Sequence, residues 1–428
     1  MRKFTGIAVL VFACLTVQAQ EKNSAWLRSL LAEKGSPLLH QILEQPDTFH
    51  YQLIYTKIDR DQHNVPHFTN YFLHVNKEAY FNPASTVKLP TALCALEKIN
   101  SLRNKGIDKY TTMLTDSAYE GQTMVRSDTS AANGLPSVAH YVKKIFLTSD
   151  NDAYNRLYEF DGQQTLNQSL WQKGYPDIRI VRRFAPATEE GNRHTNPIRF
   201  MNNGTLVYTQ PAAYSSLTFD YTKPVFEGRG HYDKDENLVM TPMDFTRHNN
   251  LPLEDLQQLL QSALFPASVP RSKRFNLTKD DEDFLYQYMS QYPSETLHPK
   301  YDTSEYFDSY TKFFMFKAGK SKIPANMRVF NKPGWSYGYL TDVAYIADFA
   351  NHVEFMLTAT IYVNSDGIIN DDKYDYDTIG YPFFKETGTI LYNYELSRPR
   401  QYTPDLQRFK LHYDSEVTGQ SMPQGAGK

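Results

Sequence analysis

Ten residues near the C-terminal end of the chain, from Glu354 to Val363, are almost continuously apolar. A strand with one solvated face alternates apolar and polar residues, whereas a strand covered on both faces has no reason to alternate. The run therefore predicts a central strand in a sheet that is covered on both sides. Two shorter strand-like segments, Met327 to Asn331 and Asp342 to Ala347, come just before it.

Strand-like segments also occur near the other end of the chain, at His50 to Lys57 and at Tyr71 to Val75. The first alternates partly between apolar and polar residues, and the second follows after a polar turn. The stretch between the two groups of strands carries mainly helix signals. This order predicts a sheet built from both ends of the chain, with a mainly helical insertion between its halves.

Four segments carry helix signals. Thr278 to Met289 opens with Thr-Lys-Asp-Asp, which resembles a capping box, and Thr241-Pro242 places proline at a first helical position. A further helix is expected over Tyr376 to Tyr394, and a short one around Ser24 to Glu44.

Composition narrows the function classes. The chain has 428 residues, a net charge of -3, 41% hydrophobic residues and 22% charged residues, which is typical of a globular protein. Charge near balance, without a long Lys/Arg block, argues against nucleic acid or an acidic membrane as a partner. The 12 histidines show no H-E-x-x-H pattern, so we expect no metal and no cofactor.

The first residues predict export. Arg2-Lys3 precedes an apolar run of eleven residues, Ile7 to Val17, and Ala19 supplies a small residue for a signal peptidase. The run is too short for a permanent anchor, and no later stretch is apolar enough to form a transmembrane segment. We expect a signal peptide over residues 1–19 and a bacterial protein that is periplasmic or secreted.

The two cysteines have different surroundings. Cys14 follows Val11-Phe12-Ala13, which only weakly resembles a lipoprotein site because Phe12 fits poorly, so anchoring at Cys14 is not expected. After cleavage at Ala19 only Cys94 remains, and no internal disulfide can form. Cys94 lies in an apolar helical run, where a free cysteine usually packs as a small hydrophobe.

The first motif with chemical potential is Ser85-Thr86-Val87-Lys88, where an extended segment becomes a helix. Ser85 and Lys88 share one helix face, and a helix start offers N–H groups and a positive dipole end to an oxyanion. A poorly solvated Lys88 could lose its proton and act as base for the Ser85 hydroxyl. The pattern alone is weak, because Ser309-Tyr310-Thr311-Lys312 repeats it.

Two further motifs follow. Ser149-Asp150-Asn151 lies in the helical block, where an isolated triplet usually caps a helix. Lys332-Pro333-Gly334 follows a strand-like segment, where a lysine usually protects a sheet edge. Together, however, the motifs read S-x-x-K, S-D-N and K-x-G in this order. From Tyr51 to Tyr394 the chain thus resembles the serine β-lactamases and penicillin-binding proteins, most closely class A.

This resemblance implies a catalytic set. Ser85 would attack the substrate carbonyl, and Lys88 would take its proton. Ser149 would relay a proton to the leaving nitrogen, helped by the field of a charged Lys332. An acyl-enzyme at Ser85 would be the intermediate.

The resemblance also implies a substrate-binding set and a fold. Asn151 would hydrogen-bond the acyl side chain of the substrate, and the N–H groups of Ser85 and Trp335 would bind the oxyanion, beside Gly334. The implied fold is α+β: an antiparallel sheet flanked by helices, plus an all-α domain, with the cleft between them.

The expected domain boundaries follow from the motifs. Residues 20–84 and 326–397 would form the α/β domain. Residues 85–325 would form the mainly helical domain, with insertions at about 192–239 and 292–325. Residues 398–428 would be a C-terminal tail.

One departure from class A concerns deacylation. An E-x-x-L-N loop there carries the glutamate that activates the deacylating water, and the matching stretch here is Arg182-Arg183-Phe184-Ala185-Pro186. Ala185 stands where the glutamate would fall. Glu189 or Glu190 would be substitutes, although acidic loop residues are more often simply solvated.

A second departure is Pro333, where the family usually carries Thr or Ser to help hold a substrate carboxylate. Proline has neither a side-chain hydroxyl nor a backbone N–H. Recognition of penicillins and D-Ala-D-Ala ends is therefore in doubt, and Ser336 or Arg328 would have to compensate.

The sequence favours an exported serine hydrolase or peptidase acting on small amide or peptide-like substrates, including cell-wall-derived ones. A class A-like β-lactamase, an esterase with the same site and a penicillin-binding module without turnover stay open as alternatives. The natural substrate, the role of the insertions and the oligomeric state do not follow from the sequence.

Overall fold

The computed structural model describes residues 23–414. The expected signal peptide, Cys14 and the end of the expected tail lie outside the described residues. The main sheet is antiparallel, with five strands in the order β12-β13-β14-β1-β2. Its strands are β1 (Gln52–Arg60), β2 (Pro66–Leu73), β12 (Met327–Ser336), β13 (Tyr339–Asp348) and β14 (Val353–Tyr362). The sheet joins both ends of the chain, as predicted.

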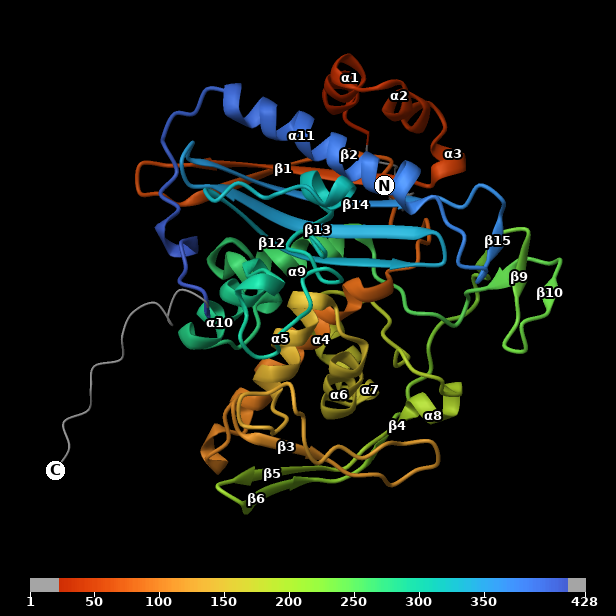
Figure 1. Cartoon of the computed structure of the whole chain (residues 1–428), viewed down its shortest axis with the longest axis vertical. Helices are drawn as coiled ribbons and strands as arrows, with labels where there is room; N and C mark the ends of the chain where they lie inside the picture. Colours follow the sequence, from red (N-terminus) through yellow and green to blue (C-terminus); the bar gives the residue numbers. More distant parts are fainter. Residues whose placement is uncertain (1–22, 415–428) are drawn as a thin grey trace, which may run out of the picture.

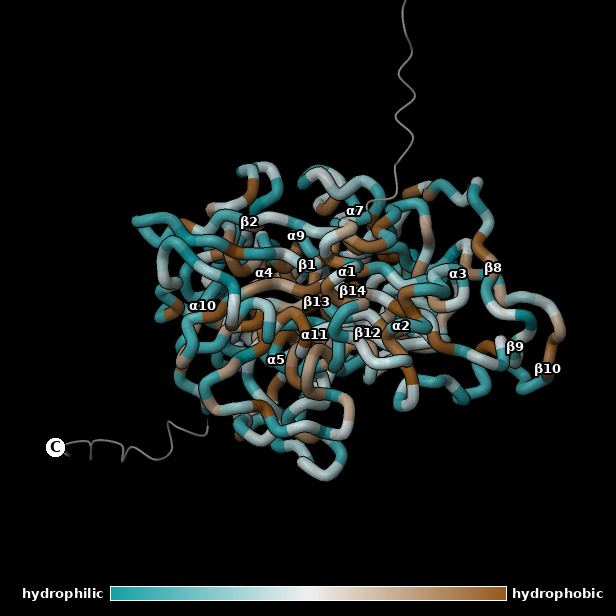
Figure 2. The backbone as a smooth tube through the Cα atoms, turned by 90° about the horizontal axis from the view of Figure 1, so that it is seen from above, coloured by the Kyte–Doolittle hydropathy of each residue, from teal (hydrophilic) through white to brown (hydrophobic). Residues whose placement is uncertain are grey.

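Both faces of this sheet are covered, and β14 is its central strand, as its apolar run predicts (Figure 1). Ile346 and Phe355, which are paired across β13 and β14, pack into the core on one face. Their neighbours Tyr345 and Met356 pack into the core on the other face. Alternate residues thus serve two cores, and the hydrophobic segments gather at the centre of Figure 2.

Helices form the layers on the two faces (Figure 1). One layer consists of α1 (Ala25–Lys34), α2 (Pro37–Glu44) and α11 (Tyr381–Ser397). The other side carries α4 (Lys88–Ser101), α5 (Val138–Thr148), α6 (Asn151–Asp161), α7 (Gln163–Gln172), α9 (Leu253–Leu264) and α10 (Lys279–Ser290). The fold is α+β, as the resemblance implied.

The segment between the main strands also contains short strands. The three-stranded sheet β3-β5-β6 lies at the far end from the main sheet (Figure 1). The remaining short elements are α3 (Pro46–Phe49), β3 (Thr112–Thr115), α8 (Glu189–Arg193), β4 (His194–Thr195), β5 (Ile198–Asn202), β6 (Thr205–Gln210), β7 (Ala213–Tyr214), β8 (Phe226–Glu227), β9 (Gly230–Tyr232), β10 (Leu238–Val239), β11 (Met243–Asp244) and β15 (Ile368–Ile369). Most of these strands come from the stretch expected as an insertion at 192–239.

Several helix expectations need correction. Thr241-Pro242 begins no helix, because Met243 and Asp244 pair with strand β8 instead. The helix expected around Ser24 to Glu44 is two helices, and Ser36 caps the second through the N–H of Leu39. At Thr241-Pro242, pairing with strand β8 overrides the local helix signal. At Ser36, a helix cap divides the expected single helix into two.

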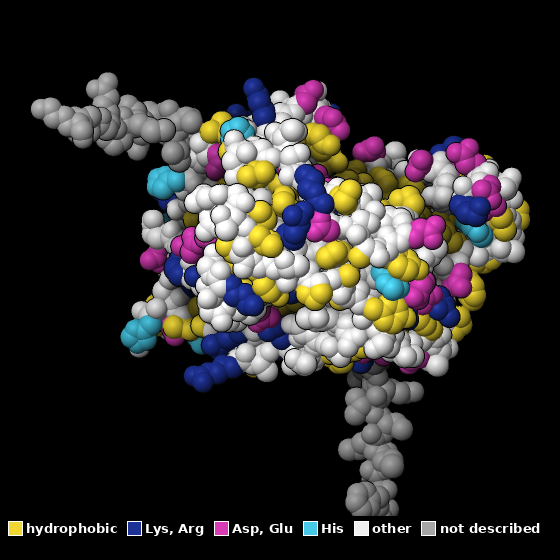
Figure 3. Space-filling model, turned by 90° about the horizontal axis from the view of Figure 1, so that it is seen from below, with side chains coloured by type: hydrophobic (Ala, Val, Ile, Leu, Met, Phe, Trp, Pro, Cys, Tyr) yellow, Lys and Arg dark blue, Asp and Glu magenta, His cyan; other side chains and the backbone are white. Residues whose placement is uncertain are grey.

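Other local expectations are confirmed. Thr278 and Asp281 form a reciprocal capping box at the start of α10. Cys94 is a buried free cysteine within α4, where it packs in the core. Within residues 23–414, no helix combines the length and the apolarity needed to cross a membrane. Basic and acidic side chains are interspersed on the face drawn in Figure 3, in keeping with the balanced charge.

Candidate active site

The serine of the first motif lies in a tight turn ahead of α4. Ala84–Val87 forms a 3-10 turn that runs directly into the helix, so Ser85 is at a helix start as predicted. Ala84 has a left-handed φ of 44°, which is costly for a residue with a Cβ, and its N–H donates to Asn82 Oδ1 at 2.9 Å. Ser85 is half-buried and lines a cleft of about 430 Å³.

Strand β12 runs against this turn at Gly334. A Cβ atom added there would lie 2.7 Å from the Ser85 nitrogen and 2.8 Å from the Pro83 oxygen. No side chain fits at such distances. The glycine of the third motif therefore lets the sheet edge approach the backbone that carries Ser85.

Lys88 is fully buried one turn after Ser85. Its Nζ donates to Asn151 Oδ1 at 2.6 Å and to the carbonyl and hydroxyl oxygens of Ser149. Among the hydrogen bonds of residues 23–414, none joins Lys88 to the Ser85 hydroxyl. Burial lowers the pKa of Lys88 to about 7, partly offset by Asp150, so a substantial neutral fraction exists near neutral pH.

The S-D-N motif forms the turn between α5 and α6. Ser149 ends α5 with a left-handed φ of 61°, and Asp150 caps α6 by accepting from the N–H of Ala153 at 2.7 Å. The capping role expected of an isolated triplet is thus present. The same turn also presents Ser149 and Asn151 to Lys88, so the structural and the functional interpretation coexist.

Lys332 reaches the same hydroxyl from the edge strand. Its Nζ lies 2.8 Å from Ser149 Oγ and 2.7 Å from its neighbouring carbonyl, Pro333 O. Lys332 is fully buried, unlike a lysine that merely protects a sheet edge. Ser149 Oγ therefore lies between two lysine side-chain nitrogens, at 2.8 Å from Lys332 and 3.3 Å from Lys88.

The positive charge expected on Lys332 is disfavoured by the surroundings of its Nζ. Burial and the nearby Lys88 lower the pKa of Lys332 well below the usual lysine value. The carboxyl group of Asp342 opposes this shift, but burial raises its own pKa to about 7. Two like charges around one hydroxyl, with a half-protonated acid nearby, cannot both persist without cost.

The second S-x-x-K match has different surroundings. Ser309 is buried at 2% exposure and does not line the cleft. Lys312 donates to Met289 O and Asn331 Oδ1, both at 2.7 Å. Lys312 is a buried structural lysine, and its serine has no access to a substrate in the described cleft.

The cleft brings together three of the predicted site residues, Ser85, Asn151 and Trp335. Lys88, Ser149 and Lys332 lie behind them in the hydrogen-bonded cluster, and Gly334 backs the Ser85 turn. The cleft also contains residues that sequence reasoning missed: Arg182, His248, Asn249 and Tyr337. Of these, only Arg182 lies in a stretch that the sequence analysis singled out, Arg182 to Pro186, and it was given no role there.

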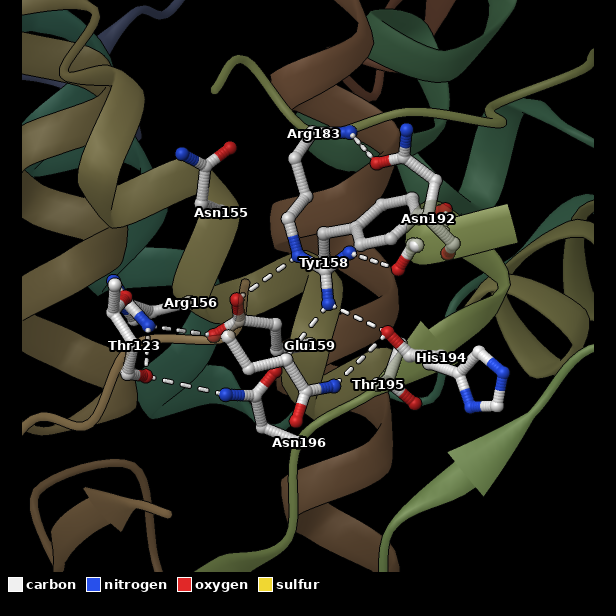
Figure 4. A network of polar contacts seen from close by, with 12 residues as sticks. Thr123, Asn155, Arg156, Tyr158, Glu159, Arg183, Asn192, His194, Thr195 and Asn196 are labelled. Atoms are coloured by element: carbon white, nitrogen blue, oxygen red, sulfur yellow. Dashed lines mark hydrogen bonds and ion pairs between the residues drawn. The ribbon is translucent and has the colours of Figure 1, made fainter. Parts of the chain in front are cut away.

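Arg183 anchors the loop that lines one side of the cleft. It is buried, and its Nε donates to Glu159 Oε1 at 3.0 Å, while Glu159 also accepts from Arg156 Nη1 at 2.9 Å. Figure 4 shows Arg183 reaching from the loop toward Glu159, with Asn192 bound to its backbone N–H. This network fixes the loop to α6.

Ala185 lines the cleft, as does Phe184 before it, which places the loop beside Ser85. Among residues 23–414, no Asp or Glu lines this cleft. Glu189 pairs with Arg247 at 2.7 Å, and Glu190 lies 3.3 Å from His194, so both carboxylates are engaged outside the cleft. Neither is placed to replace the missing glutamate.

Arg328 and Ser336, which would have to replace the hydroxyl missing at Pro333, have different surroundings. Arg328 forms a two-pronged pair with Glu295, at 2.8 and 2.9 Å, so its guanidinium is occupied. Ser336 lines the cleft. Of the two, only Ser336 is placed to meet a substrate.

Comparisons with known proteins agree with the motifs. A family model described as the β-lactamase enzyme family matches residues 61–217. Comparison with curated proteins gives no match.

Solved structures similar to the chain include a β-lactamase from Xanthomonas campestris pv. campestris, with 15% identity, coverage of 86% of this chain and 97% of that one, and a TM-score of 0.46. A β-lactamase from Sphaerobacter thermophilus has 13% identity, coverage of 85% and 98%, and a TM-score of 0.45. A class A β-lactamase described as the last common ancestor of Gram-negative bacteria has 14% identity, coverage of 86% and 99%, and a TM-score of 0.46.

The segment matched by the family model contains Ser85, Lys88, the S-D-N turn and the loop around Ala185. The resemblance to the serine β-lactamases and penicillin-binding proteins is thereby confirmed, and residues 61–217 match the model of the β-lactamase enzyme family.

Proposed function

We propose that the chain is an exported serine hydrolase that forms an acyl-enzyme at Ser85 with small amide or peptide-like substrates. The observation that carries the proposal is the Ser149 hydroxyl, held between Lys88 and Lys332 behind the cleft that Ser85 lines. A hydroxyl in hydrogen-bond reach of two amines with lowered pKa values is suited to proton transfer. Burying two amines and a hydroxyl so close together costs free energy. A purely structural role would therefore not account for the arrangement.

The acylation step follows from these groups. Ser85 Oγ forms a bond to the substrate carbonyl carbon, and neutral Lys88 takes the hydroxyl proton. The carbon–nitrogen bond then breaks, and the leaving nitrogen takes the proton of Ser149 Oγ. A lysine ammonium restores the Ser149 proton. The helix start at Ser85 stabilises the oxyanion with backbone N–H groups.

Deacylation is the weak step of the proposed cycle. Water must add to the acyl carbon, and a base must take its proton. The cleft lining contains no carboxylate for this purpose. This observation favours a second candidate, a penicillin-binding module with little turnover, over an efficient class A-like β-lactamase. An esterase with the same site would differ in its leaving group only.

The test is intact mass spectrometry after incubation with benzylpenicillin and, separately, with a fluorophosphonate probe. The proposal expects one adduct, mapped to Ser85, from at least one reagent, and none from Ser85→Ala. Ester and anilide substrates with the same acyl group then separate esterase from amidase. Absence of any Ser85 adduct with both reagents would refute a serine hydrolase.

A further inference from the structure

Arg182 brings a cationic side chain to the lining of the cleft beside Ser85. Its Nη1 lies 3.0 Å from His248 Nε2, and this is the only hydrogen bond of the guanidinium within residues 23–414. No Asp or Glu of the described chain pairs with it. The Nε and Nη2 donors, which form one edge of the planar group, are thus available to an oxygen acceptor from a ligand.

His248 holds this guanidinium as a neutral acceptor. Burial and the positive charge of Arg182 lower the pKa of His248 to about 4. Because Arg can only donate, Nε2 must be the unprotonated nitrogen of His248. That lone pair is used by Arg182, so His248 positions the guanidinium and is not free to act as the missing deacylation base.

The backbone around Arg182 is fixed on both sides. Its carbonyl accepts from the Tyr154 hydroxyl at 2.8 Å, and the N–H of Val181 donates to Asn249 Oδ1 at 2.8 Å. The buried Arg183 network follows directly in the chain (Figure 4). Because its backbone is already fixed, the Arg182 guanidinium loses little conformational entropy when it binds a ligand.

We propose that Arg182, positioned by His248, binds a carboxylate on the acyl part of the substrate. The inference rests on the proposed function, because the acyl part is defined by attack of Ser85. Arg182 and Ala185 belong to the loop that lines the cleft, and Asn151, the residue expected at the acyl side chain, lines the same cleft. Lys332 and Ser149 lie on the side expected for the leaving group.

A two-pronged contact between guanidinium and carboxylate is both strong and geometrically selective. The site therefore selects substrates with an acidic acyl group, such as peptides in which an acidic side chain or a free carboxylate precedes the bond to be cleaved.

Carbenicillin and benzylpenicillin test this proposal, because they differ by one carboxylate on the acyl side chain. The ratio of their rates of Ser85 acylation should favour carbenicillin. It should fall about tenfold or more in Arg182→Met and less in Arg182→Lys, as expected when a charge-assisted pair is lost. Arg247→Met, an exposed arginine paired with Glu189, is the matched control and should keep the ratio. An unchanged ratio in Arg182→Met overturns the proposal.

A binding experiment separates this inference from the proposed function. In Ser85→Ala protein, where no acyl-enzyme can form, calorimetry compares the monoamide of phenylmalonate with phenylacetamide, which differ by one carboxylate. We expect the monoamide to bind about tenfold more tightly, and this preference to vanish with the additional change Arg182→Met. If the preference is present but the unmodified protein forms no Ser85 adduct, the proposed reaction is refuted and the anion site is retained. Equal binding of the two amides would refute the anion site, whatever Ser85 does.

Discussion

Lys332 donates a 2.8 Å hydrogen bond to the hydroxyl of Ser149, a residue 183 positions earlier in the chain. The bond connects the edge strand β12 to the turn between α5 and α6. Because Lys88 lies 3.3 Å from the same hydroxyl, the three motifs form one buried cluster. In the proposed reaction, proton transfer depends on this hydroxyl and on which of the two lysines is protonated.

Ser85 should be the only serine that carries an adduct with penicillin or a fluorophosphonate. Ser85→Ala should abolish labelling because no other serine of the described part of the chain combines the cleft, the helix start and Lys88. Ser309→Ala is the matched control and should label normally, since Ser309 is buried away from the cleft. Peptide mapping after intact mass measurement checks both variants, and an adduct at Ser309 would contradict the assignment.

The rate of acylation should rise with pH through an apparent pKa near 7. Lys88 must be neutral to accept the Ser85 proton, its pKa is lowered to about 7, and the neutral form grows as pH increases. Lys88→Arg should abolish acylation, because a guanidinium stays charged at these pH values. Rates of adduct formation across the pH range provide the measurement. A pH-independent rate would exclude Lys88 as the base.

Lys332→Arg should keep a measurable fraction of acylation, in contrast to Lys88→Arg. An arginine at 332 would place a permanent positive charge close to Lys88 across the Ser149 hydroxyl. A nearby positive charge disfavours protonation of Lys88, so the pKa of Lys88 should fall. The acylation rate should then rise at a lower pH than in the native protein. An equal loss in both variants, or a rise shifted to higher pH, would argue against these roles.

Acyl-enzyme formed with penicillin should persist. A missing general base costs about 10²–10⁴-fold in rate, or roughly 3–5 kcal/mol of barrier. Ala185→Glu should shorten the lifetime of the adduct, since residue 185 lines the cleft. The decay of the adduct mass over time is the readout, with Ala185→Gln as the uncharged control. Fast turnover in the native protein would show that another group already serves as base.

Glu159→Ala should destabilise the fold and loosen the loop that carries Ala185. Glu159 is buried and accepts from both Arg156 and Arg183. Its removal would leave Arg183 without a carboxylate partner and Arg156 with Asp152 alone. Removing one partner of a buried ion pair typically costs about 3–5 kcal/mol. Chemical denaturation measures the change. Glu189→Ala removes an exposed carboxylate from the same region and should leave the midpoint nearly unchanged.

Gly334→Ala should slow acylation by displacing the Ser85 turn. The new Cβ would lie 2.7 Å from the Ser85 nitrogen, so the strand or the turn must move. A displacement of this kind near a reacting group can cost about 10²-fold in rate. Burst amplitude and rate with a fluorophosphonate report it, while the melting temperature shows whether the sheet is retained. Native rates in the variant would mean that the close approach has no role in catalysis.

Much of the fold follows from local patterns. The apolar run at Glu354 to Val363 predicted the central strand, because a strand covered on both faces needs no polar side. The capping box at Thr278 predicted the start of α10. The failure at Thr241-Pro242 has a clear cause: Met243 pairs with β8, a contact that no local pattern contains.

The candidate site divides in the same way. The sequence by itself determined which residues have the necessary chemistry, through S-x-x-K, S-D-N and K-x-G in order, and it determined that Ala185 and Pro333 depart from class A. Only the tertiary structure decided that Lys332 and Lys88 meet at the Ser149 hydroxyl, that Ser309 is buried, and that Arg182 shares the cleft with His248. The physical reason is that residue type and helix position are local properties. Burial, which lowers the pKa values of both lysines, depends on segments packed together from distant parts of the chain.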